Sequence, residues 1–245
     1  MVGMTSSTYF HGTYDGDGHT MNVSLTSTED YCAPFRYIYY GSTFRRINVT
    51  GSITTSGSYA AGLIGYMYYN TNNISYCRSS VTINSSVNNN YSSHGGFIGY
   101  TNANVNITNC LFDGSLLGNN SGGCGGFVGY QSSNAELTNC LFAPAALTVS
   151  ETNSFTFVRS NGFVLTNCYY TEILGTEQGT SVGAMTVQQL KAALGDGWEI
   201  ANNTVVPVQD IKNLKAGSIK CNSFIPYTGS EITLNPTIKI GRAHV

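Results

Sequence analysis

Charged residues are scarce in this chain of 245 residues: Asp, Glu, Lys and Arg make up only 10% of it, against about 25% in typical soluble domains. The formal net charge is −2, which excludes the strongly basic surface of a protein that binds nucleic acid or an anionic membrane. No apolar run approaches the roughly 20 residues of a membrane-spanning helix. We therefore expect no nucleic-acid partner and no membrane insertion.

Tryptophan and proline are also rare, with one Trp and five Pro, whereas Gly (28) and Tyr (17) are abundant. Together with many Ser, Thr and Asn residues, this composition favours strands and turns. The first residues lack the basic start and apolar core of a signal peptide. We therefore expect a fragment whose secretion signal and cell anchor lie elsewhere in a longer protein.

Metal-binding patterns are missing as well. The sequence has no C-x-x-C pair, and its four His are scattered, so we expect no metal and no cofactor. Four of the seven cysteines recur in phase, at Cys77, Cys110, Cys140 and Cys168. We predict a buried column of free thiols. Disulfides between neighbouring copies are the alternative, although the odd count argues against a full framework.

One stretch is repeated along the chain. Gly95-Gly-Phe-Ile-Gly-Tyr100 with Ile107-Thr-Asn-Cys-Leu-Phe112 returns 30 residues later as Gly125-Gly-Phe-Val-Gly-Tyr130 with Leu137-Thr-Asn-Cys-Leu-Phe142. An earlier copy begins at residue 61 and a worn copy at residue 155. A period near 30 marks a solenoid, in which stacking of successive turns, here called rungs, builds the core. We predict an all-β, right-handed parallel β-helix.

Each rung is expected to hold a short apolar strand, a polar turn, a second strand and a loop. In the second strand Val105 and Ile107 alternate with Asn106 and Thr108, which indicates one packed and one wet face. The Asn before each Cys, at positions 109, 139 and 167, suggests a ladder of side-chain amides. Tyr76 interrupts that column in the first regular copy.

The chain divides into five predicted segments. Residues 1–30 start the solenoid, with a turn at Asp15-Gly-Asp-Gly18 that favours a tight hairpin over a calcium loop. Residues 31–171 form the rungs, and Phe35 is aligned with Leu63. Residues 172–208 form a C-terminal cap. Residues 209–239 suggest a truncated Ig-like, β-sandwich repeat, and residues 240–245 match the translation of a sequencing adapter.

The predicted cap contains a helix over about residues 186–194, opened by a Thr186–Gln189 capping box, and a hairpin around residues 202–203. We expect Leu190, Leu194 and Trp198 to close the end of the solenoid. Trp198 as a platform for a sugar ring is the minor alternative.

The repeated Gly-Leu/Phe-Ile/Val-Gly-Tyr and Thr-Asn-Cys pattern resembles the GLUG-motif repeats of bacterial surface proteins. The opening Phe10-x-Gly-x-Tyr-Asp-Gly-Asp-Gly-His-Thr20 resembles the segment that begins such solenoids, and Tyr227-Thr-Gly-Ser-Glu-Ile232 resembles the start of small Ig-like repeats. The resemblance implies a parallel β-helix in a secreted or cell-surface adhesin-like protein. It carries over no catalytic residues, and Arg159 and Ser160 depart from the pattern in the last copy.

Two functions remain open. The first is a non-enzymatic adhesin-like domain or spacer that binds glycans or extracellular proteins along its side. The candidate ligand-binding residues would then be Tyr66, Tyr68, Tyr69, Tyr100 and Tyr130. An inward, packing role for these rings is slightly favoured, because aromatic residues in repeats usually pack.

The alternative is a polysaccharide lyase or glycoside hydrolase. Glycoside hydrolysis needs two facing carboxylates. Asp113 and Glu136 are the pair most suited by spacing, but each looks like an individual substitution in its repeat. His94 lies beside Ser92 and Ser93, but adjacency in the chain does not indicate a catalytic arrangement. No residue is predicted to be catalytic.

Overall fold

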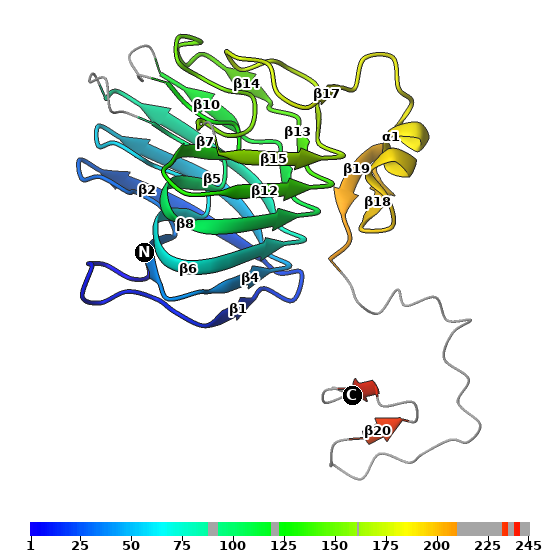
Figure 1. Cartoon of the computed structure of the whole chain (residues 1–245), viewed down its shortest axis with the longest axis horizontal. Coiled ribbons are helices and arrows are strands. Elements are labelled where there is room, and N and C mark those ends of the chain that lie inside the picture. The colour runs from blue at the N-terminus through cyan, green and yellow to red at the C-terminus, as the bar shows by residue number, and fades with distance from the viewer. Residues whose placement is uncertain (88–92, 119–122, 161, 210–231, 235–237, 241–245) are drawn as a thin grey trace. The chain divides into compact units, whose positions relative to one another are not determined.

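The computed structural model describes residues 1–87, 93–118, 123–160 and 162–209, together with the strands at 232–234 and 238–240. The chain divides into two compact units, Met1–Asp210 and Ile211–Val245. The first unit is a β-solenoid of about five turns, built from two parallel sheets (Figure 1). The predicted parallel solenoid is therefore confirmed.

Each rung contributes one segment to each sheet. The first sheet contains β1 (Thr13–Asp15), β3 (Phe35–Tyr39), β4 (Thr43–Arg45), β6 (Ile64–Ser75), β8 (Ile98–Thr108), β11 (Val128–Gln131), β12 (Ala135–Thr138) and β15 (Phe163–Thr166). The second sheet contains β2 (Thr20–Ser27), β5 (Asn48–Thr55), β7 (Arg78–Ser85), β9 (Leu111–Phe112), β10 (Ser115–Leu117), β13 (Leu141–Phe142), β14 (Ala146–Leu147), β16 (Tyr169–Tyr170) and β17 (Thr180–Ser181).

The strands of the first sheet differ from the prediction in length. β6 and β8 run without interruption through the segments that were expected to be two strands joined by a polar turn. The rung before them has such a break between β3 and β4, and the rung after them has it between β11 and β12. The predicted alternation is confirmed in β8, where Val105 and Ile107 are buried and Asn106 and Thr108 are half-exposed.

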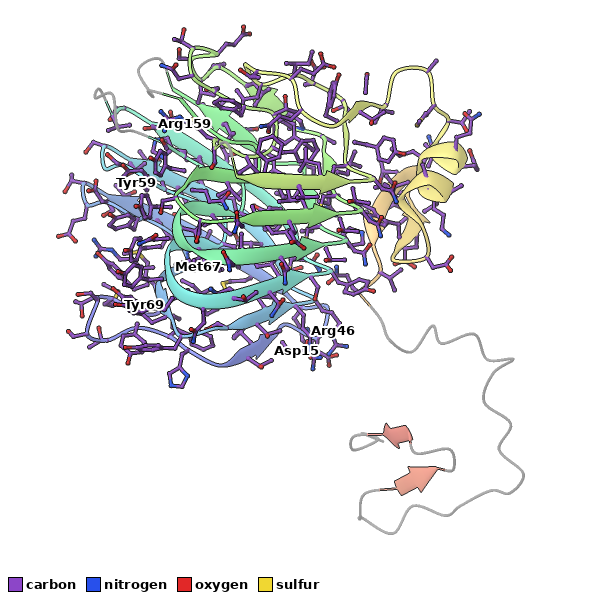
Figure 2. All side chains as sticks on the ribbon, in the orientation of Figure 1. Asp15, Arg46, Tyr59, Met67, Tyr69 and Arg159 are labelled. Atoms are coloured by element: carbon purple, nitrogen blue, oxygen red, sulfur yellow. The ribbon has the colours of Figure 1, made fainter. Side chains whose placement is uncertain are left out.

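The turn at Asp15–Gly18 is a corner of the solenoid rather than a hairpin. β1 pairs with β4 in the first sheet and β2 pairs with β5 in the second, so the two strands that the turn joins never pair with each other. Asp15 accepts from Arg46 at 2.5 Å, and Arg46 also meets Asp17 at 3.1 Å (Figure 2). The arginines thus neutralise the carboxylates that a calcium loop would have needed.

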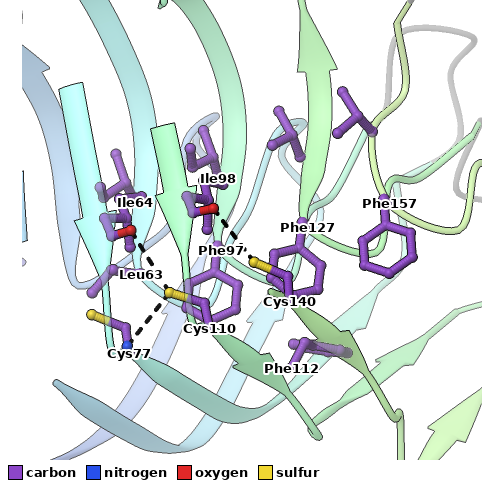
Figure 3. Close-up of a cluster of buried hydrophobic side chains, with 14 of the residues drawn as sticks. Leu63, Ile64, Cys77, Phe97, Ile98, Cys110, Phe112, Phe127, Cys140 and Phe157 are labelled. Carbon is purple, nitrogen blue, oxygen red and sulfur yellow. Dashed lines mark hydrogen bonds between the residues drawn. The ribbon is translucent and has the colours of Figure 1, made fainter. Parts of the chain in front are cut away.

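Identical side chains stack inside the solenoid. The rings of Phe97 and Phe127 stack at a centroid distance of 5.0 Å, and those of Phe127 and Phe157 at 5.3 Å (Figure 3). Phe112 and Phe142 form a second pair at 5.6 Å. These rings are fully buried, and a rung cannot bury them alone, so the core exists only when the rungs are stacked.

The predicted cysteine column is also confirmed. Cys77, Cys110, Cys140 and Cys168 are buried and free, and each thiol donates to the carbonyl two residues back, at the end of the preceding strand. Burial raises the pKa of Cys110 and Cys140 well above the ordinary thiol value. These thiols therefore stay protonated and serve as small apolar core groups.

The asparagine before each cysteine lies at the corner between the two sheets. Asn109, Asn139 and Asn167 have φ of 53°, 53° and 50°, the left-handed conformation that Asn tolerates better than most residues. The predicted amide ladder is present at one step, where Asn167 donates to Asn139 at 3.2 Å. At Asn109 the side-chain oxygen is buried with no hydrogen-bond partner among the described residues. Backbone conformation, more than the ladder, explains this column.

The C-terminal helix and hairpin form as predicted. α1 (Val187–Leu194) begins at Thr186 with both hydrogen bonds of the capping box. β18 (Trp198–Ala201) pairs antiparallel with β19 (Thr204–Pro207) through Asn202 and Asn203, both at positive φ as a tight hairpin turn requires.

We expected this helix and hairpin to close the C-terminal end of the solenoid. That location is wrong, because they cover the outer face of the second sheet. Leu190, Leu194 and Trp198 pack against Leu111 and Leu141, which point outward from β9 and β13. The Trp198 indole donates to the Asn139 carbonyl at 3.0 Å, and the ring is only 1% exposed. Burial also rules out Trp198 as a sugar platform.

A single glutamine covers part of the last rung. Gln178 Oε1 accepts from the backbone N–H of Phe157 at 2.9 Å and of Val158 at 2.8 Å, and its Nε2 donates to Val158 O at 2.9 Å. One rung below, Phe127 and Val128 make their bonds with the next rung's backbone. The Gln178 amide thus takes the place of a further rung and blocks an open sheet edge.

In the second unit, β20 (Ile232–Leu234) pairs antiparallel with β21 (Ile238–Ile240). The rest of the predicted Ig-like segment (209–239) and of the adapter segment (240–245) lies outside the described residues, apart from residue 209. No helix in the described part of the chain has the length and apolar character to cross a membrane.

Candidate functional site: a tyrosine surface on the outer face

The five candidate tyrosines lie on the outside of the solenoid. In β6, Ile64 and Met67 are buried while Tyr66 and Tyr68 are half-exposed, and the following Tyr69 is 47% exposed. The same pattern leaves Tyr100 half-exposed and Tyr130 37% exposed. The slight preference for an inward, packing role was therefore wrong.

The exposed rings form a continuous column across the rungs. Tyr66 stacks on Tyr100 at 5.2 Å, and Tyr100 stacks on Tyr130 at 5.4 Å, with interplanar angles of 21° and 17°. Tyr37 extends the column downward, 5.8 Å from Tyr66. Parallel pairing with one tyrosine per rung produces this stack.

Other tyrosines join the column from both sides. Tyr31 stacks on Tyr59 at 5.4 Å, and Tyr59 meets Tyr100 edge-on at 5.2 Å. The resulting tyrosine surface, a name used below for all of these residues, has eleven members: Tyr9, Tyr31, Tyr37, Tyr39, Tyr40, Tyr59, Tyr66, Tyr68, Tyr69, Tyr100 and Tyr130.

Six of these residues were missed from the sequence, and an alignment error explains two of them. The predicted alignment of Phe35 with Leu63 is off by one residue, because the structure pairs Phe35 with Ile64. The corrected register places Tyr37 beside Tyr66 and Tyr39 beside Tyr68. In a strand, a shift of one residue exchanges the inner and outer faces, so the error hid the start of the column.

Four of the five described tyrosines with left-handed backbone lie on the tyrosine surface; the fifth is Tyr76. Tyr31, Tyr40, Tyr59 and Tyr69 have φ between 61° and 63°, a conformation that costs a bulky residue about 1–2 kcal/mol. Asn and Gly would adopt this conformation more readily, and the chain uses them at many other corners. Strained residues that gather on one exposed surface point to a role beyond stability.

Three partly buried phenols of this surface are held neutral at physiological pH. Burial among neighbouring rings raises the pKa of Tyr31 to about 12 and also raises the pKa of Tyr59 and Tyr66. Each neutral hydroxyl can both donate and accept a hydrogen bond. The surface therefore offers aromatic faces edged by neutral polar groups.

A polar groove continues from the tyrosine column along the same outer face. Beyond Tyr100, strand β8 presents Asn102, Asn104 and Asn106 outward. A groove of about 540 Å³ opens there, lined mainly by amide and hydroxyl groups together with Glu136. Asn106 donates to Asn73 of the rung below at 3.0 Å, so the predicted type of amide bond between rungs also occurs in this column.

The two carboxylates considered for hydrolysis do not face each other. Asp113 follows β9 of the second sheet, where Arg78 donates to it at 2.5 Å and Ser80 binds it at 2.5 Å. Glu136 projects from β12 of the first sheet into the polar groove. The cluster of Asp113, Glu136 and an arginine that would support an enzyme does not form.

His94 is a structural residue held in the core. Its Nδ1 accepts from the Ala60 N–H at 3.0 Å, so the neutral ring carries its proton on Nε2 and donates to Ser85 Oγ, 2.7 Å away. A ring in this tautomer cannot take the Ser85 proton. Burial lowers the pKa of His94 to about 4, and both side chains are sealed from solvent.

Within the part of the chain that the structure describes, no three His, Cys, Asp or Glu side chains gather closely enough to hold a metal ion. Comparison with protein-family models, curated proteins and solved structures finds no match to the chain. The tyrosine surface is therefore assigned as the candidate site on its geometry alone.

Proposed function

We propose that this chain is a non-enzymatic, adhesin-like domain of a secreted or cell-surface bacterial protein, and that it binds glycans through the tyrosine surface. The observation that carries the proposal is the continuous contact of eleven exposed or half-exposed tyrosine rings over successive rungs. A monomeric protein rarely exposes such a patch without a binding role. The resemblance to GLUG-motif repeats supports the cellular setting.

The chemistry of this outer face suits a sugar polymer better than an apolar ligand. Aromatic faces pack against the C–H groups of a sugar ring, while neutral phenols and the amides of the adjoining groove can exchange hydrogen bonds with its hydroxyls. The surface is long and open rather than enclosed. It therefore matches an extended chain more closely than a small molecule.

The test is a binding screen of the full chain against an array of glycans and extracellular-matrix proteins. The double variant Tyr66→Ala/Tyr100→Ala removes the centre of the column, and we expect it to weaken glycan binding by about tenfold or more. The matched control is Tyr76→Ala, a half-exposed tyrosine outside the surface. This control should bind as the wild type does.

Three results would contradict the proposal. Binding to no glycan would favour a spacer, and binding to proteins alone would assign the other partner class. Release of shortened chains from any bound polysaccharide would instead support the lyase or hydrolase alternative. A Glu136→Gln variant that abolished such release would locate the activity in the polar groove.

A further inference from the structure

Arg159 breaks the repeat at the edge of the tyrosine surface. The pairing of Val128 with Val158 places Arg159 beside Gly129, in a column that holds Gly65 and Gly99 in lower rungs. A side chain at Gly99 would collide with the backbone of Tyr59. Glycine is therefore required in the lower rungs, and the last rung replaces it with the longest cationic side chain.

The neighbouring corner carries small residues close to this arginine. The bridges between Ala61, Gly95 and Gly125 align Tyr59 with Ser93 and Gly123 on successive rungs. The residue at this corner thus becomes smaller toward Arg159. Gly123 has a φ of 82°, and a Cβ there would lie 2.6 Å from Asn153 O and 2.7 Å from Arg159 Nε. Glycine therefore suits the backbone of this corner and also leaves space for the guanidinium.

The guanidinium is held in a fixed position. Its Nε donates to Asn153 O at 3.0 Å, its Nη1 donates to Ser93 Oγ at 2.6 Å, and its centre lies 5.5 Å from the centroid of the Tyr130 ring. Figure 2 shows Arg159, Tyr59 and Tyr69 one below another along the same edge of the solenoid. Arg159 therefore ends the tyrosine surface with a positive charge stacked on its last ring.

No described carboxylate neutralises this charge. Each of the other arginines in the described residues has an acidic partner: Arg36 pairs with Glu29, Arg45 and Arg46 with Asp15, and Arg78 with Asp113. The acid that flanks the tyrosine surface, Asp30, is on the Tyr31 side and accepts from Ser58 N at 2.7 Å. The two bonds of Arg159 use Nε and Nη1, which leaves Nη2 for a ligand.

We propose that Arg159 binds the acidic group of an anionic polysaccharide whose sugar rings lie along Tyr130 and Tyr100. This inference rests on the proposed function and names the class of glycan that the tyrosine surface binds. A planar guanidinium presents paired N–H donors to a carboxylate or sulfate, and a charge-assisted hydrogen bond is roughly twice as strong as a neutral one. The stacking on Tyr130 and the bond to Ser93 orient the group before the ligand arrives.

The experiment compares two forms of one polymer, polygalacturonate and its fully methyl-esterified form, with dextran sulfate as the sulfate probe. The full chain and the variants Arg159→Gln, Arg159→Lys, Tyr100→Ala and Arg78→Gln are titrated with each polymer by calorimetry. Circular dichroism melting checks that each variant is folded. Arg78→Gln is the matched control, because it removes an arginine from the other sheet.

The wild type should bind polygalacturonate more tightly than its ester. Arg159→Gln should lower affinity for the acid form about tenfold and leave the ester within about twofold. Arg159→Lys should recover part of the loss, whereas Tyr100→Ala should weaken both forms. A stronger effect on dextran sulfate than on polygalacturonate would assign sulfate as the preferred group.

Three results would overturn this inference while leaving the proposed function intact. The first two are equal binding of the acid and ester forms by the wild type, and an equal loss on both forms in Arg159→Gln. A loss on the acid form in Arg78→Gln as large as in Arg159→Gln would do the same. Absence of binding to every glycan, in this titration and on the array, would instead overturn the proposed function. The two failures are therefore distinguishable.

Discussion

Two aromatic columns run across overlapping sets of rungs, one inside the solenoid and one outside. The inner rings of Phe97, Phe127 and Phe157 stack at 5.0 and 5.3 Å, and the outer rings of Tyr66, Tyr100 and Tyr130 stack at 5.2 and 5.4 Å. Their geometry is nearly identical because both follow the spacing of paired parallel strands. Their surroundings differ completely, since the inner rings are fully buried and Tyr130 is 37% exposed.

Stacking distance therefore carries no information about purpose. The inner column is needed to fill a core that no rung can fill alone, whereas the outer column buries only part of each ring. The tyrosine surface around the outer column also contains strained backbone, at Tyr31, Tyr40, Tyr59 and Tyr69. Stability explains the phenylalanines, and the tyrosines need a second explanation, which binding supplies.

The largest difference between the columns should appear in stability. Phe127→Ala leaves a cavity between two stacked neighbours and should lower the free energy of unfolding by about 3–5 kcal/mol. Tyr100→Ala loses partial burial and ring contacts, so the expected loss is about 1 kcal/mol. Urea unfolding followed by circular dichroism measures both. Equal losses would mean that the outer column is also a core element and would remove the argument for binding.

The second contrast concerns titration inside the solenoid. The pKa of His94 is about 4 in the folded chain and 6.5 for a free imidazole, so the folded state binds fewer protons between these values. The free energy of unfolding should have its full value above about pH 6.5 and should fall as the pH drops toward 4, by about 3 kcal/mol in total. Urea midpoints measured at pH 7.5, 5.5 and 4.5 would show this loss.

His94→Gln is the control, because an amide keeps hydrogen-bonding groups at this site without a proton to gain. This variant should be less stable than the wild type at pH 7.5, but its stability should fall much less between pH 6.5 and 4. The hydrogen bond from Arg46 lowers the pKa of Asp15 from 3.8 to about 2. Protonation of Asp15 therefore reduces the stability of the fold mainly below the pH range in which His94 titrates. An unchanged decline in His94→Gln would show that other groups control it.

The sequence was sufficient for the solenoid, the thiol column and the capped helix, because each depends on local pattern. The period of 30 placed Phe97 over Phe127, and the capping box located the start of α1. The position of the cap could not be derived this way. The outward-facing Leu111 and Leu141 form an apolar patch on the side of the second sheet, and the cap packs there. The local sequence of the cap does not indicate whether it covers the side or the end of the solenoid.

The candidate site was only partly predictable for a related reason. Recurrence identified Tyr66, Tyr100 and Tyr130 but did not show their direction, which depends on alternation from a buried neighbour such as Met67. Tyr31 and Tyr59 lie outside regular strands and meet through left-handed corners. Contacts of that kind depend on the path of the backbone, which the sequence pattern does not specify.

The smallest expected effect concerns the corner asparagines, and it tests whether their backbone conformation or their side-chain amide bonds stabilise the solenoid. Asn139 is left-handed at the corner between the sheets, and its side chain accepts from Asn167. If backbone conformation explains this asparagine, Asn139→Gly should be more stable than Asn139→Ala by about 0.5–1 kcal/mol, the strain on alanine less the extra chain entropy of glycine. Urea unfolding of the two variants measures the difference.

Asn106 provides the matched comparison, because it makes a similar amide bond, to Asn73, from an extended strand on the outer face. Glycine has no conformational advantage in a strand, so there the alanine variant should be the more stable one. A reversal of order between the two sites would show that the corner asparagines are selected by the backbone. Equal losses in all four variants would instead assign the stability to amide bonds between rungs, and the corners would then hold the rungs together rather than turn the chain.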